Sequence, residues 1–268
     1  MSNMSPYKTI AVASTFSPRF EAVLAEAKRV RDRFQCELAL IYVGERTDET
    51  AGKFRDAFAR LSLPLDSNVH YAQGDPSERI LQALSANKID MIVAGALEKE
   101  LVLHPFLGNV ARRLLREAGC SVMLFTQPQI EPKMLRKLVF VADYSAHARE
   151  ALRRAFQFAA AEKSECLYVI RVITPFDKAR ASLDPDASER FGDTEADLEK
   201  FVLSAGHTDV PIEARCIRGN TGFAAADFVQ SIGADLLVVP VAPSSDGSVP
   251  SNIAWLTDVI PCNLWLVR

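Results

Sequence analysis

A long internal repeat constrains the fold of this 268-residue chain more than any other feature of its sequence. Residues 7–17 (YKTIAVASTFS) have the same pattern as residues 135–145 (LRKLVFVADYS): an apolar run that ends in small and polar residues. Four more apolar runs recur in the same order, namely 37–43 with 166–172, 69–74 with 214–219, 90–96 with 235–241, and 120–125 with 262–267. A repeat of this length indicates two duplicated domains rather than a solenoid.

Helical patterns separate these apolar runs in both copies. Apolar residues at helical spacing form one face after each first run: Phe20, Val23, Leu24, Ala27, Val30 and Phe34 in the first copy, and Leu152, Ala155, Phe156 and Ala159 in the second. We expect Ser17, with Pro18 at the first helical position, and Ser145 to cap these helices, and Asp75 and Asn220 to cap the third helix of each copy. Strands that alternate with helices predict a parallel sheet with right-handed crossovers, covered by helices on both faces.

The boundary between the copies is the polar segment 126–133 (TQPQIEPK), which contains two prolines. The sequence therefore predicts one domain over residues 1–128 and a second over residues 134–268. The longest weakly apolar stretch, residues 174–208, is expected to be a solvated loop followed by the outer helix of the second copy. The charged run 28–33 (KRVRDR) is expected to be the solvated face of the first helix.

Composition excludes several classes of function. The net charge of −3 provides no large basic field for nucleic acid, and no apolar run approaches the roughly 20 residues of a membrane span. The start of the chain lacks the pattern of a signal peptide, so we expect a cytoplasmic protein that binds neither nucleic acid nor membrane. The five cysteines contain no CxxC pair and are expected to be buried, reduced thiols: Cys36, Cys120, Cys166, Cys216 and Cys262. No pair of Cys and His residues has the spacing of a zinc site, so we expect no bound metal.

The loops that follow the first and fourth strands are the candidate binding region, because ligands of open α/β sheets bind beyond the carboxyl ends of the strands. In the first copy Gly95 ends the fourth apolar run, and Gly108-Asn109 begins the next helix. A glycine at a helix N-terminus lets an anion approach the free N–H groups. Asn109 can equally be a simple N-cap with no ligand, and the sequence leaves both interpretations open.

The chain resembles a tandem universal stress protein over nearly all of both halves. The motifs that carry this resemblance are ASTFS and ADYS after the first strands, GDPSERI at residues 74–80, and GNVARRLLREAGCSVMLF at residues 108–125. The resemblance implies an α/β fold of two tandem five-stranded parallel sheets between helices, in the order 3-2-1-4-5 of the adenine-nucleotide alpha-hydrolase-like fold. For one branch of the family it also implies an ATP site of the form G-x2-G-x9-G-[ST], joined by an Asp after the first strand.

The first half matches that ATP motif in part. The candidate cofactor-binding residues that the resemblance gives in this half are Thr15, Val43, Gly95, Glu98, Gly108, Asn109 and Val110. Gly95 and Gly108 match the first and last glycines, whereas Thr15 replaces the Asp and Glu98 the middle glycine. A carboxylate a few ångströms from a phosphate costs about 1 kcal/mol in water and more when partly shielded. Three nearby cations could offset this charge: Lys99, Arg112 and Arg113.

The second half keeps the Asp of the motif, Asp143, but loses its glycines. Pro240 and Pro250 stand at the two glycine positions, and the loop between them is three residues shorter. Proline lacks an N–H donor and restricts the backbone, so this loop cannot reproduce the phosphate-binding loop of the glycine motif. Asp143 is either a ligand contact or a brace for its own loop.

These patterns favour a non-enzymatic stress-response and regulatory protein with at most a degenerate nucleotide site in the first domain. ATP is the one candidate cofactor, and a small-molecule or nucleotide ligand and an unidentified protein are the candidate partners. No catalytic residues are expected, since no P-loop and no GxSxG motif is present. The alternative is a slow ATP hydrolase that uses the loop of the first domain.

The two last strands are the expected contact between the domains. Residues 120–125 and 262–267 contain no charge and no proline, so neither strand carries the usual protection of an exposed sheet edge. We therefore predict that they pair antiparallel and make the two domains an internal pseudo-twofold dimer. A further homodimer of the whole chain stays open.

Overall fold

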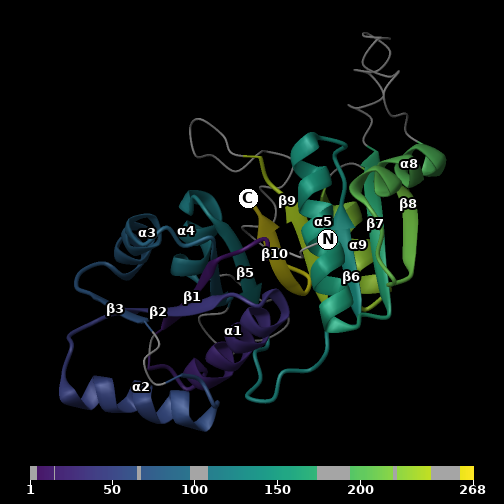
Figure 1. Cartoon of the computed structure of the whole chain (residues 1–268). Helices are drawn as coiled ribbons and strands as arrows, with labels where there is room; N and C mark the ends of the chain where they lie inside the picture. The colour runs from purple at the N-terminus through teal and green to yellow at the C-terminus, as the bar shows by residue number, and fades with distance from the viewer. Residues whose placement is uncertain are drawn as a thin grey trace. The chain divides into compact units, whose positions relative to one another are not determined.

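The computed structural model describes residues 5–14, 16–64, 68–96, 108–173, 194–219, 222–242 and 260–268. The chain divides into two compact units, Met1–Lys133 and Met134–Arg268 (Figure 1). Each unit is a single parallel sheet with helices packed on it.

The first unit alternates strands and helices from end to end. Its elements are β1 (Thr9–Ser14), α1 (Phe20–Phe34), β2 (Glu37–Val43), α2 (Asp48–Arg60), β3 (Asn68–Ala72), α3 (Pro76–Ala86), β4 (Met91–Gly95), α4 (Asn109–Glu117) and β5 (Ser121–Phe125). The strands lie in the order β3-β2-β1-β4-β5, and neighbouring strands in this unit are parallel. At the centre of the sheet Val12 lies between Leu40 of β2 and Val93 of β4. The helices α1 and α2 lie on one face of this sheet, and α3 and α4 lie on the other (Figure 1).

The second unit repeats this order of elements. Those described are β6 (Lys137–Val141), α5 (Ala146–Glu162), β7 (Cys166–Ile173), α8 (Glu195–Ala205), β8 (Ile212–Arg218), α9 (Gly222–Ser231), β9 (Leu236–Pro240) and β10 (Asn263–Val267). The strand order β8-β7-β6-β9-β10 is again 3-2-1-4-5, and the pairs are again parallel. The predicted fold and strand order are thus confirmed in both units. The expected last helix of the second copy falls in residues 243–259, outside the described residues.

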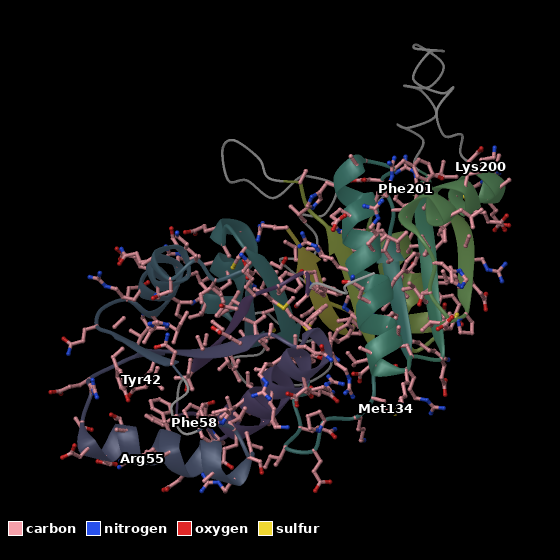
Figure 2. The ribbon with its side chains drawn as sticks, viewed as in Figure 1. Tyr42, Arg55, Phe58, Met134, Lys200 and Phe201 are labelled. Atoms are coloured by element: carbon pink, nitrogen blue, oxygen red, sulfur yellow. The ribbon has the colours of Figure 1, made fainter. Side chains whose placement is uncertain are left out.

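Burial along the strands follows their place in the sheet. The central strand β1 buries Ile10, Ala11 and Val12 completely, whereas every residue of the edge strand β3 is at least partly exposed. A central parallel strand is covered by helices on both faces, which explains its continuous apolar run. On α2 the buried Phe58 faces the unit and the exposed Arg55 faces solvent (Figure 2).

Two of the predicted helix caps are confirmed and one is wrong. The side chains of Ser145 and Asp75 accept hydrogen bonds from the third helical N–H group of α5 and α3. The helix α1 instead begins at Phe20, because the Phe20 N–H donates to the Ser17 carbonyl (2.9 Å) and closes a turn before the helix. Asn220 lies outside the described residues.

The cysteines and the charged run of α1 also differ from expectation. All five cysteines are free thiols, but they are half-buried rather than fully buried. Burial raises the pKa of both the Cys36 and the Cys262 thiol to about 12, so both are protonated at neutral pH. The run 28–33 is not wholly solvated, since Arg29 is buried. No helix in the part of the chain that the structure describes is long and apolar enough to cross a membrane.

Arg29 belongs to a buried ion pair that fastens the segment after β5 to α1. Its Nη2 lies 2.6 Å from Glu26 Oε2, and the two side chains are only 7% and 6% exposed. Arg29 Nη1 also donates to the carbonyl of Lys133 (2.5 Å), and the guanidinium lies over the Phe125 ring, 5.5 Å from its centre. The Gln129 N–H donates to Glu26 Oε1 at 3.4 Å. One helix turn therefore holds both the end of β5 and the chain that leaves it.

Replacing Glu26 with Gln should destabilise the protein strongly, because it leaves the Arg29 charge buried without its carboxylate. Removing one partner of a buried pair typically costs about 3 kcal/mol or more. We expect a loss of that size in the free energy of unfolding, measured by urea denaturation of the full chain. Glu45→Gln, at an exposed side chain, is the control. Equal stability of the two variants would contradict this role of the pair.

Candidate functional site

The carboxyl ends of β1, β2 and β4 lie at one edge of the first sheet, because the three strands are neighbours and parallel. Ser14 at the end of β1 is opposite Tyr42, the residue before Val43 at the end of β2. Gly95 ends β4 on the other side of β1. The structure thus brings Val43 and Gly95 to the same edge. Thr15 lies outside the described residues.

Gly95 stands where the chain leaves the sheet for the loop 97–107, a segment outside the described residues that includes Glu98. The Ala96 N–H donates to the Phe125 carbonyl (2.9 Å), and the Gly108 N–H donates to the Ala96 carbonyl (3.1 Å). The two ends of the loop 97–107 are therefore joined by the hydrogen bond between Gly108 and Ala96. A Cβ atom on Gly95 would lie 3.3 Å from Val23 Cγ2 of α1, so the strand end is packed tightly against that helix.

The N-terminus of α4 is open with respect to the described residues, none of which caps it through a side chain. Gly108 is its N-cap residue, with extended backbone (φ −64°, ψ 156°) and no side chain that caps the helix. Asn109 is the first helical residue, so its interpretation as the N-cap is wrong. The N–H groups of Asn109, Val110 and Ala111 have no acceptor within the helix, whose first bond runs from the Arg112 N–H to the Gly108 carbonyl (3.0 Å). Free N–H groups and the helix dipole make this end suited to an anion.

Arg112 and Arg113, which follow in α4, differ in the hydrogen bonds and ion pairs that they make. Arg113 Nη1 donates to Ser77 Oγ (2.7 Å) and lies 3.2 Å from Asp75 Oδ1, while its Nε donates to Glu117 (3.1 Å). Arg113 therefore joins α4 to the start of α3. Arg112 is half-buried, and its buried Nε has no hydrogen-bond partner in the part of the chain that the structure describes.

Arg112 is the cation near the start of α4 for which the described residues show no hydrogen bond or ion pair. Because side chains on a helix tend to lean toward its N-terminus, we expect the Arg112 side chain to lie near the first turn. Lys99, the third cation that the sequence offers, falls in the loop outside the described residues.

A hydrogen-bonded network holds the position of α4. Asp75 Oδ1 caps α3 by accepting from the Glu78 N–H (2.9 Å) and also accepts from Ser77 Oγ (2.7 Å). These bonds, the one from Ser77 first, lower the pKa of the Asp75 carboxyl below its usual value. The carboxylate is therefore ionised at neutral pH, and it attracts the Arg113 side chain.

In the second unit the Asp143 side chain makes a hydrogen bond within its own loop. Its Oδ1 accepts from the Ser145 N–H (2.9 Å), directly before the cap of α5. Tyr144 between them has a left-handed backbone (φ 63°), which is uncommon for an aromatic residue. The guanidinium of Arg171 lies over the Tyr144 ring, 5.1 Å from its centre. Pro240, at the first glycine position, is the buried last residue of β9; Pro250 falls outside the described residues.

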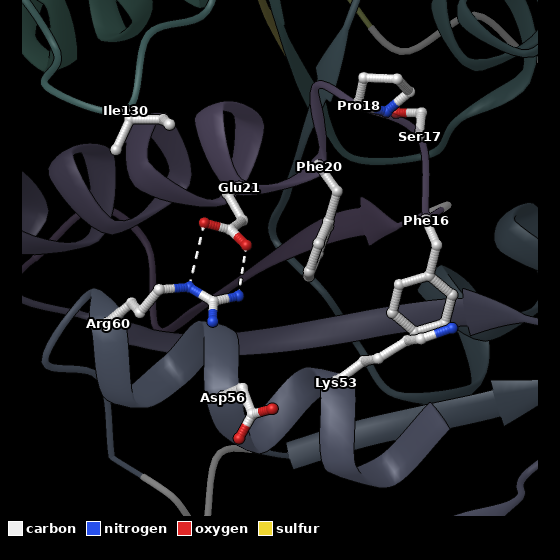
Figure 3. Close-up of a pocket in the computed structure, with 9 residues that line it drawn as sticks. All are labelled: Phe16, Ser17, Pro18, Phe20, Glu21, Lys53, Asp56, Arg60 and Ile130. Carbon is white, nitrogen blue, oxygen red and sulfur yellow. Dashed lines mark hydrogen bonds and ion pairs between the residues drawn. The ribbon is translucent and has the colours of Figure 1, made fainter. Parts of the chain in front are cut away.

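A concave surface elsewhere in the first unit is not marked by any of the sequence motifs. It is a hollow of about 530 Å³ between α1 and α2, beside Ile130 of the segment that follows β5 (Figure 3). Aromatic residues at positions 16, 20 and 54 are visible in the sequence, but their meeting requires the fold. Among the described residues no group of three His, Cys, Asp or Glu side chains is arranged to hold a metal ion.

Comparison with known proteins agrees with this architecture. The chain matches the universal stress protein family over residues 63–126 and 134–267, more than half of its length. It belongs to that family, with one family domain in each half, as the sequence predicted.

Particular relatives resemble either one half or the whole chain. A Thermus aquaticus protein, the universal stress protein in QAH/OAS sulfhydrylase 3′ region, is 31% identical in a match 135 residues long that covers 44% of this chain and 98% of that protein. A functionally unknown protein from Pseudomonas aeruginosa PAO1 shares the fold with a TM-score of 0.73 at 17% identity, over 100% of this chain and 94% of the other. A universal stress protein from Archaeoglobus fulgidus DSM 4304 gives 0.68 at 15% identity, over 98% and 99%. Both solved structures share the fold of this chain over nearly all of its length.

Proposed function

We propose that this protein is a non-enzymatic stress-response regulator whose first unit binds the phosphates of an adenine nucleotide weakly. Membership of the universal stress protein family supports the stress-response role. The observation that carries the nucleotide part is the open N-terminus of α4 beside the uncommitted Arg112. Its three N–H groups and one guanidinium offer a phosphate both charge and hydrogen-bond donors.

Two residues are the reason for weak binding. Glu98 adds negative charge to the loop that connects Gly95 with Gly108. Thr15 has no carboxylate to accept hydrogen bonds from a ribose. The second unit has Asp143, but Pro240 ends β9 there without a backbone donor. Nucleotide binding is therefore assigned to the first unit alone.

The division of the motif between the halves supports a binding role over catalysis. Transfer of a phosphoryl group needs a positioned nucleophile and charge neutralisation of the phosphates in one site. The carboxylate after the first strand is present in the second half, at Asp143, and absent from the first, at Thr15. The half with the open helix end thus lacks the acidic partner.

Replacing Arg112 with Ala should weaken ATP binding about tenfold, because one hydrogen bond to a charged group contributes about 1.5 kcal/mol or more. Isothermal titration calorimetry of the full chain measures the dissociation constant, expected in the micromolar range or weaker. Arg116→Ala, at an exposed arginine of the same helix, is the matched control. Equal loss in both variants, a submicromolar constant for the native chain, or no binding at millimolar ATP would contradict the proposal.

Replacing Glu98 with Gly should tighten ATP binding, because it removes a negative charge and restores the glycine of the motif. We expect a gain of about fivefold, equivalent to about 1 kcal/mol of relieved repulsion. Glu100→Gly changes the same charge two residues along the loop and serves as the control. A Glu98→Gly variant that binds no better than Glu100→Gly would show that Glu98 does not oppose the phosphates.

Incubation of the purified chain with ATP and Mg²⁺ should release no phosphate above the buffer rate. Phosphate release is followed over hours at saturating ATP, with Arg112→Ala as the comparison. Sustained release by the native chain that disappears in Arg112→Ala would overturn the non-enzymatic assignment and establish the slow ATP hydrolase.

A further inference from the structure

The hollow between α1 and α2 has an aromatic floor. Phe16 stacks on Phe54 with ring centres 4.7 Å apart and an angle of 27° between the planes. The Phe20 ring packs edge-on against the rings of Phe16 and Phe54, and its centre lies 5.7 Å from the centre of each. Phe20 and Phe54 are buried, at 8% and 1% exposure, so the floor is fixed by packing. Ile130, which borders the same hollow, keeps 60% of its surface exposed.

One face of α2 lines the hollow with charges. Lys53, Asp56 and Arg60 follow at spacings of three and four residues, which places them on the same side of the helix. Arg60 is paired with Glu21 of α1 through both its Nε and its Nη2 (Figure 3). These two opposite charges neutralise each other within the wall.

The remaining two charges of that face are not equivalent. Lys53 Nζ lies 2.7 Å from Glu49 Oε1, and it also lies over the Phe16 ring, 5.2 Å from its centre. Asp56 is exposed and makes no hydrogen bond or ion pair with the described residues. The four charged side chains that line the hollow sum to zero, but Lys53 has its carboxylate partner, Glu49, outside the lining. Asp56 is therefore the one charge of the lining without an ion-pair partner among the described residues.

We propose that this hollow is a second ligand site, specific for an organic ammonium compound with an aromatic or branched apolar body. The apolar body would lie on Phe16 and Phe20 and cover Ile130, and the ammonium group would donate to Asp56. A volume of about 530 Å³ falls in the range of small-molecule sites. Aromatic faces also attract cations, and Lys53 already occupies such a position over Phe16.

An anionic ligand fits this hollow less well. Both cations of the wall already have carboxylate partners, Glu49 and Glu21. An anion would therefore meet the free carboxylate of Asp56 without gaining an uncommitted cation. The site shares no residue with the open end of α4, so the ammonium proposal stands independently of nucleotide binding.

Three probes with the same phenyl ring test the charge preference: phenethylamine, phenylalanine and 3-phenylpropionate. Titrations of the ¹⁵N-labelled full chain, followed by amide shifts of Ser17, Lys53 and Ile130, report binding at the hollow. Phenethylamine should bind and 3-phenylpropionate should not. Binding of phenylalanine would identify the source of the ammonium group as an amino acid, and its failure would identify a free amine. Binding of 3-phenylpropionate as tight as that of phenethylamine would overturn the proposal.

Asp56→Asn should weaken phenethylamine binding about tenfold, as expected for loss of a hydrogen bond to a charged group. Glu45→Gln removes an exposed carboxylate outside the hollow and should leave binding unchanged. Ile130→Ser should also weaken binding, while Leu203→Ser, at another exposed apolar residue in α8, should not. All four positions are exposed, so thermal unfolding should stay close to that of the native chain. Unchanged affinity in Asp56→Asn would overturn the assignment of Asp56.

Discussion

Two neighbouring parallel strands can be joined only by a crossover that returns the chain to the edge where it started. In this protein each of the first four strands of the first unit is therefore followed by a helix, and the helices cover both faces of the sheet. The same constraint brings all the carboxyl ends of the strands to one edge. Val43, Gly95 and the start of α4 lie there because of topology, although 67 residues separate the first of these from Val110. A ligand site at that edge needs only the right side chains in the loops.

The two units carry different side chains at the carboxyl ends of their strands, and the chemistry of that sheet edge differs accordingly. Position 95 is a glycine at the end of β4, whereas its counterpart Pro240 ends β9 and has no N–H to offer. Tyr42 of β2 belongs to the aromatic cluster of the first unit, whereas Arg171 at the matching position of β7 lies over Tyr144. A duplicated fold has thus kept its strand order while the chemistry of its edges diverged.

Sequence periodicity was sufficient to predict the strands and the buried faces of the first helices, because burial repeats at the period of each element. The order of the strands came from the resemblance to the universal stress protein family, since periodicity does not determine which strands are neighbours. It failed where a partner lies far away in the chain. Arg29 looks solvated in a charged run, but its carbonyl partner on Lys133 is 104 residues distant. Arg112 and Arg113 are adjacent and chemically identical in the sequence. Only the position of Asp75 and Ser77 at the start of another helix shows that Arg113 is the one that forms the ion pair. The Ser17 and Asn109 caps failed for a local reason, since either residue can also precede or begin a helix.

The proposed function requires that the first unit binds nucleotide phosphate at the α4 N-terminus and that the second unit does not. A titration of the ¹⁵N-labelled full chain with ATP, followed by backbone amide shifts, tests it most directly. We expect saturable shifts of Gly95 and of the amides from Gly108 to Arg112, with Tyr144 and Val241 of the second unit unaffected. Shifts at Tyr144 and Val241 of equal size, or saturation with no change at the amides of α4, would contradict it.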